Sequence, residues 1–129
     1  MSSSRVTRVE LPAGMLLLNA NDRLHRMVQA KRAKAIREAA RAAARGHDGP
    51  YGRVYLRVMF RAPDNRRRDS NTGNLHPSIK AAIDGITDSG LIKDDNDKIV
   101  LGMEIRRGEN LPKLGQLIID VIEVSDDCA

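Results

Sequence analysis

The feature that most constrains the fold is residues 21–45, a long stretch that contains neither Gly nor Pro. It is rich in Ala, Arg and Lys, which are strong helix formers, and it stops at Gly46, a residue suited to close a helix. The sequence therefore predicts one long helix here. Its predicted apolar face consists of Leu24, Met27, Val28, Ala35, Ile36 and Ala39.

Strand patterns lie on both sides of this helix. Residues 5–10 and 53–61 alternate polar with apolar side chains, and residues 98–106 and 114–124 predict two further strands. Apolar residues spaced three and four apart predict a second helix from about residue 75 to Ser89. The order β-α-β-α-β-β predicts an α+β fold, in which two main helices cover a small mixed β-sheet.

Length and composition limit the classes of protein that fit. A chain of 129 residues suits a single domain over residues 1–129, with a mainly aliphatic core because only 2% of the residues are aromatic. The single Cys128 excludes an intrachain disulfide and a cysteine-rich zinc site. No apolar run is long enough for a membrane span, so we expect a cytoplasmic protein with no membrane partner.

Charge is distributed unevenly along the chain. The formal net charge is +5, and residues 22–68 hold Arg or Lys at 14 positions against four acidic residues. Residues 84–97 reverse this balance, with five Asp and one Lys. A basic half beside an acidic cluster is typical of a protein that binds phosphates and also holds a divalent cation.

Polar clusters lie around the second helix. RRRD (66–69) precedes it, Lys80 and Asp84 lie along it, and DDND (94–97) follows it. Since such a helix is about 22 Å long, we expect adjacent strands to bring the two flanking loops together. Hydrolysis of a phosphodiester uses hard oxygen ligands for Mg²⁺, and a lysine stabilises the developing negative charge. The alternative is that DDND is only a solvated turn.

The stretch RRRDSNTGNLHPSIKAAIDGITDSGLIKDDNDKIV (66–100) resembles the core motif of the RusA-type Holliday junction resolvases, a family of endodeoxyribonucleases. The shared pattern is an Arg-rich run, an Asp, a second Asp followed by Asn, a Lys, a helix containing an Asp, and a closing Asp pair before a strand. LPAGMLLLNANDRLHRM (11–27) is similar to the family's opening strand and Asn-containing turn. The resemblance thus covers most of the chain.

The resemblance implies a Mg²⁺-dependent endonuclease, with Mn²⁺ as a substitute ion and no small-molecule cofactor. Its substrate would be branched DNA, above all four-way junctions, resolved by paired nicks that leave 5′-phosphate and 3′-hydroxyl ends. The implied assembly is a homodimer, and the implied setting is recombination, repair or phage DNA processing in a bacterial or phage-infected cell.

The resemblance also implies roles for individual residues. Asp69, Lys80 and Asp95 correspond to the catalytic residues, and Asp69 and Asp95 to metal ligands, with Asp94 as a further candidate ligand. Asp84, one turn after Lys80, corresponds to the helix Asp, and its simplest role is to orient the lysine ammonium. The alternative for Asp84 is a plain surface ion pair.

One position departs from the family pattern. The second carboxylate should directly precede Asn74, a supporting residue, but Gly73 occupies this position in a loop about two residues longer than usual. Asn71 is the candidate ligand in its place, because an amide oxygen still binds Mg²⁺ with one negative charge fewer. Asp84 or Asp94 could also fill this place. The departure leaves open a catalytically weakened branched-DNA-binding module.

The remaining candidates are basic residues and histidines. Arg66, Arg67 and Arg68 are expected to bind DNA phosphates, because guanidinium groups match phosphate oxygens and the triplet abuts Asp69. The alternative is a solvated run of charges. His25 and His76 are predicted to face solvent or to cap their helices.

Overall fold

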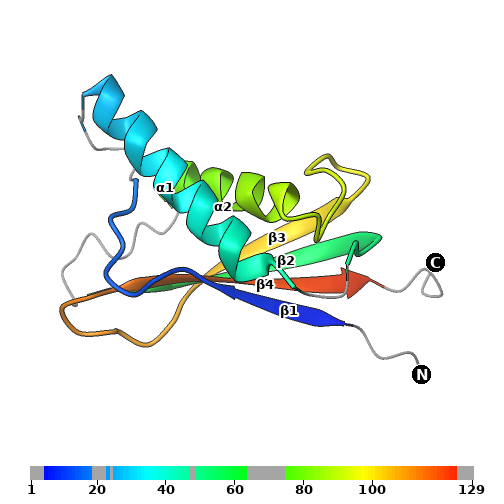
Figure 1. Cartoon of the computed structure of the whole chain (residues 1–129). Helices are drawn as coiled ribbons and strands as arrows, with labels where there is room; N and C mark the ends of the chain where they lie inside the picture. The colour runs from blue at the N-terminus through cyan, green and yellow to red at the C-terminus, as the bar shows by residue number, and fades with distance from the viewer. Residues whose placement is uncertain (1–4, 19–22, 24, 47–48, 64–74, 125–129) are drawn as a thin grey trace.

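Six elements follow one another in the predicted order β-α-β-α-β-β (Figure 1). The computed structural model describes residues 5–18, 23, 25–46, 49–63 and 75–124. The elements are β1 (Val6–Glu10), α1 (Arg26–Ala44), β2 (Arg53–Arg61), α2 (His76–Asp88), β3 (Val100–Arg107) and β4 (Gln116–Val124). The predicted α+β fold is confirmed.

The four strands form one mixed sheet in the order β1-β4-β2-β3. β2 and β3 are parallel, whereas β4 pairs antiparallel with both β1 and β2. Parallel neighbours need a crossover connection, and α2 is part of the connection between β2 and β3. Both helices lie on the same face of the sheet (Figure 1). α2 is therefore held over the sheet with one side facing the solvent.

The core is aliphatic, as the composition predicts. β2 and β4 contribute fully buried side chains, including Leu56, Val58 and Ile119, and α2 contributes Ile79 and Ile86. Burying side chains of this kind yields about 1.5–3 kcal/mol each relative to leaving them exposed. α1 and α2 approach each other closely at Gly85. A Cβ on Gly85 would collide with the Arg37 carbonyl oxygen of α1.

The structure corrects both the start of the predicted α1 and part of its predicted buried face. The helix begins at Arg26 rather than at residue 21, and His25 Nδ1 accepts a hydrogen bond from the Met27 N–H at 3.1 Å, which confirms the predicted capping role. The buried residues of α1 are Ile36, Ala40 and Ala44.

The predicted apolar face of α1 is confirmed for Ile36, which is buried, and Ala39, which packs against the core, and is wrong for three other residues. Met27 is 74% exposed, Val28 is 41% exposed and Ala35 is exposed, while Leu24 lies outside the described residues. The physical reason is visible in Figure 1, where the first half of α1 rises away from the sheet. None of the four described strands lies beneath this half of the helix to cover its side chains.

α2 agrees with its prediction more closely. Pro77 lies in its first turn, Gly90 follows its end with a positive φ of 87°, and His76 is exposed as expected. Leu75, directly before the helix, is buried. Neither of the described helices has the length and apolar character needed to span a membrane.

Candidate active site around Lys80

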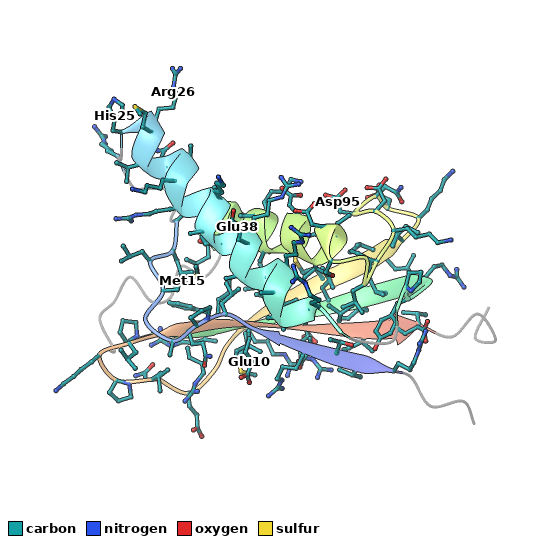
Figure 2. All side chains as sticks on the ribbon, in the orientation of Figure 1. Glu10, Met15, His25, Arg26, Glu38 and Asp95 are labelled. Carbon is teal, nitrogen blue, oxygen red and sulfur yellow. The ribbon has the colours of Figure 1, made fainter. Side chains whose placement is uncertain are left out.

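The ammonium group of Lys80 joins α2 to the acidic loop that follows the helix. Lys80 Nζ donates to Asp84 Oδ1 at 2.9 Å and to Asp95 Oδ2 at 3.0 Å. The predicted pairing of Lys80 with Asp84, one turn apart, is therefore present. The contact with Asp95 joins residues that lie 15 positions apart. Figure 2 shows Asp95 over the exposed side of α2.

The loop is anchored at its start by two buried residues. Leu91 and Ile92 are only 2% and 1% exposed. The Leu91 carbonyl accepts a hydrogen bond from the Tyr51 N–H at 2.7 Å, and Ile92 forms an isolated parallel bridge with Tyr51. The polar residues that follow are thus held beside the segment that leads into β2.

Hydrogen bonds within the loop set its shape. Asp94 Oδ1 accepts from the Asp95 N–H at 2.7 Å, and Asp94 Oδ2 accepts from Asn96 Nδ2 at 3.2 Å. Asn96 Oδ1 in turn accepts from the Lys98 N–H at 2.9 Å and from the Ile99 N–H at 3.2 Å. Side chains that bond nearby backbone are the usual means by which Asp and Asn stabilise turns. The turn directs Asp95 back toward α2.

The contacts around Lys80 fix its charge. Its pKa is raised from the usual lysine value, first by the hydrogen bond with Asp84 and then by the one with Asp95. The pKa of Asp95 is lowered, mainly by Lys80 and further by Asp94. At neutral pH the pair is therefore an ammonium and a carboxylate. Because the Lys80 side chain is 65% exposed, a phosphate can approach it from solvent.

The described residues show one of the two polar clusters that were expected to meet. β2 and β3 are parallel, so β2 ends at the opposite end of the strand pair from the loop before β3. The expected approach of the 66–69 loop to the 94–97 loop involves residues outside the described part of the chain and stays a prediction. The 94–97 loop folds back along α2, where Asp95 reaches Lys80 in the first half of the helix.

Several of the predicted site residues lie outside the described residues. They are Arg66, Arg67, Arg68, Asp69, Asn71, Gly73 and Asn74. All of them belong to the segment that leads directly into α2, whose first turns include Lys80.

The described carboxylates suit a divalent cation only in part. Asp84 and Asp95 approach one and the same cationic group, and carboxylate oxygens are the ligands that Mg²⁺ prefers. Among the residues that the structure describes, however, no three His, Cys, Asp or Glu side chains gather as a metal site. The ligands Asp69 and Asn71, which the resemblance implies, lie outside the described residues.

Asn96 is the residue of this loop whose role the sequence interpretation missed. Its signal was available, since Asn commonly bonds the backbone two residues ahead. The sequence does not show, however, that the resulting turn aims Asp95 at a helix.

Comparisons with known proteins add no family. Neither the protein-family models nor the curated protein sequences yield a match to this chain.

Proposed function

We propose that this protein is a Mg²⁺-dependent endonuclease that cuts branched DNA, as the resemblance to the RusA-type resolvases implies. The preferred substrate is a four-way junction in recombination, repair or phage DNA processing in the cytoplasm. The observation that supports this proposal best is the exposed Lys80 ammonium held between Asp84 and Asp95. This arrangement combines a fixed positive charge with carboxylates next to it.

Lys80 is the group proposed to contact the scissile phosphate. Its ammonium can donate to a phosphate oxygen and stabilise the negative charge that develops on cleavage. Asp84 restrains the ammonium from one helical turn away. A donor that is already oriented needs less reorganisation in the transition state, so Asp84 is proposed as a positioning residue.

Asp95 is the described residue proposed to hold Mg²⁺, with Asp69 and Asn71 as partners from the segment outside the described residues. Asp84 contacts the same ammonium group as Asp95 and is a further candidate for an oxygen ligand. Both oxygens of Asp94 accept hydrogen bonds within the loop, so Asp94 shapes the turn, and it stays a further candidate ligand. When bound, Mg²⁺ would supply neutralisation of phosphate charge and activation of a water molecule.

The assembly proposed for this function is a homodimer. A four-way junction requires two nicks, and a two-fold symmetric dimer presents two equivalent sites. The net charge of +5 supports a polyanionic partner because it favours the approach of phosphates from a distance.

A second candidate function is junction binding without efficient cleavage. It is favoured by Gly73, which stands where the family pattern has a carboxylate. A site with one negative charge fewer would bind Mg²⁺ more weakly. The two candidates differ only in catalysis.

The test is cleavage of a synthetic four-way junction with and without Mg²⁺ by the wild type and by Asp95→Asn. We expect Mg²⁺-dependent nicking by the wild type, loss of nicking in Asp95→Asn, and unchanged or tighter junction binding, because the change removes negative charge. Asp97→Asn is the matched control, since Asp97 is exposed in the same loop and contacts no described cation.

Three outcomes are informative. Cleavage by Asp95→Asn at the wild-type rate would contradict the proposed site. A wild type that binds the junction tightly and never nicks it would favour the second candidate. Equal losses in the Asp95 and Asp97 variants would point to loop charge in general rather than to one ligand.

A further inference from the structure

A groove of about 400 Å³ lies between α1 and α2, directly beside Lys80. Its floor is apolar and is built largely from Leu18, Ala30, Ala33 and Ala81. Alanines on both helices leave the space open that larger side chains would fill. The proposed catalytic lysine thus lines a shallow, open groove.

Each rim of the groove carries one basic residue. Lys80 and Asp84 line it from α2, and Arg26 and Gln29 line it from α1. Arg26 is the first residue of α1 and is exposed at the tip of the helix (Figure 2). Its guanidinium forms no ion pair with any residue that the structure describes. No acidic side chain among the described residues thus competes with an anion for this group.

Arg37 provides the contrast on the same side of α1. At about 100° per residue, Arg37 points within about 20° of Arg26 around the helix axis. Arg37, however, is bound by Asp88 of α2 through contacts of 2.5 and 2.9 Å. One arginine of this face thus joins the helices, and the other is left at the open end of the groove.

We propose that the groove binds a stretch of DNA sugar-phosphate backbone that runs from Arg26 to the phosphate contacted by Lys80. The inference rests on the proposed function and names the path of its substrate. Arg26 and Gln29 donate hydrogen bonds to phosphate oxygens, and the alanine floor packs against deoxyribose. Guanidinium groups match phosphate oxygens in geometry, and contacts of this kind position a nuclease on its strand.

The charge of α1 supports a nucleic-acid occupant. Within α1, six residues are basic and only Glu38 is acidic. The basic residues are Arg26, Lys31, Arg32, Lys34, Arg37 and Arg41. An apolar groove flanked by a basic helix attracts a polyanion, whereas an uncharged or basic peptide would gain nothing from this charge.

The experiment measures junction affinity at several salt concentrations in the absence of Mg²⁺, so that cleavage plays no part. Arg26→Gln removes one phosphate contact. We expect affinity to fall several-fold and the slope of log K against log salt to fall by about one unit. Ala30→Leu fills the groove without changing charge, and leucine is itself a good helix former. We expect this variant to weaken binding several-fold as well.

Lys34→Gln is the matched control, because it removes a positive charge from the exposed surface of α1 without lining the groove. Its affinity should stay within about twofold of the wild type if contacts and not net charge decide binding. Circular dichroism of all variants checks that α1 is retained.

The outcomes separate this inference from the proposed function. If the wild type nicks junctions but Arg26→Gln and Ala30→Leu bind like Lys34→Gln, the groove path is overturned and the function stands. If the wild type binds but never nicks, while both groove variants still lose affinity, the groove path stands and catalysis fails. A wild type with no affinity for DNA would overturn both.

Discussion

Ser78 shows how one residue can fix the surroundings of the site. It is fully buried, two positions before Lys80, and its hydroxyl accepts a hydrogen bond from the Leu18 N–H at 2.6 Å while donating to the Leu18 carbonyl at 2.7 Å. Both backbone groups of Leu18 are thus satisfied by a single side chain. Because Leu18 is part of the groove floor, Ser78 sets the position of this floor relative to α2.

Replacing Ser78 with Ala should therefore destabilise the protein. The change leaves a buried N–H and a buried carbonyl without partners, which costs about 1–3 kcal/mol. Urea unfolding followed by circular dichroism measures the loss. Thr87→Ala is the control, because the Thr87 hydroxyl bonds only the Ile83 carbonyl of its own helix and its removal should cost less. Equal stability of Ser78→Ala and the wild type would refute this account.

At the residue scale, the contact between Lys80 and Asp84 was predictable and the contact with Asp95 was not. The first follows from one-turn spacing on a helix. The second depends on a loop that folds back, and hydrogen bonds of Asp94 and Asn96 together with burial of Leu91 determine that fold. Sequence spacing also does not show that both Asp94 oxygens accept hydrogen bonds within the turn, and the role of Asp94 as a metal ligand stays a prediction.

At the scale of elements, periodicity located the strands and helices well. β2 runs over the predicted residues 53–61, because a half-buried strand imposes period two on its side chains. The pairing order β1-β4-β2-β3 was not predictable, since no local pattern encodes which strands meet. The apolar face of α1 was partly misassigned for a related reason. The sequence shows which side chains are apolar enough to be buried. Whether they are buried depends on which elements pack against them.

The packing of α1 against α2 gives a sharper test at this scale. Gly85 lies where the helices are closest, and a methyl group there would meet the Arg37 carbonyl oxygen and Ala40. Gly85→Ala should therefore destabilise the protein by about 1–3 kcal/mol through overpacking, although alanine is the better helix former. Urea denaturation provides the measurement.

Gly52→Ala is the control for this prediction. Gly52 is exposed, and an added Cβ would contact nothing within 4 Å. The stability of this variant should stay within about 0.5 kcal/mol of the wild type, as is usual for surface substitutions. If Gly85→Ala were equally harmless, this result would contradict the close packing of α1 against α2 at Gly85.

For the molecule as a whole, the two faces of the sheet differ in what lies on them. The helices and the proposed site occupy one face (Figure 1). On the other, Arg8 pairs with Asp120 at 2.8 Å and Arg57 pairs with Glu104 at 3.1 Å. These residues are in register across all four strands, so charges alternate along the row. This row of alternating charges could not be predicted from the sequence, because it depends on the order in which the strands pair.

The surface that the fold leaves uncovered bears on the proposed dimer. Leu16 is 65% exposed and Val28 is 41% exposed, and they line a mainly apolar hollow beside α1. Its other lining residues are Met15, Ala35, Lys31 and Arg32. At about 100° per residue, Val28 and Ala35 lie on the opposite side of α1 from Arg26. A second copy packed on this hollow would leave the α1–α2 groove of each protomer open to DNA.

We therefore expect light scattering to give twice the chain mass of 14.3 kDa at micromolar concentration. The double variant Leu16→Ser with Val28→Ser should shift the mass toward the monomer, because it removes apolar area that pairing would bury. Leu114→Ser is the control, since Leu114 is also 54% exposed but does not line the hollow. A monomeric wild type would contradict the dimer. A wild-type dimer that the double variant leaves intact would keep the dimer but place its interface elsewhere.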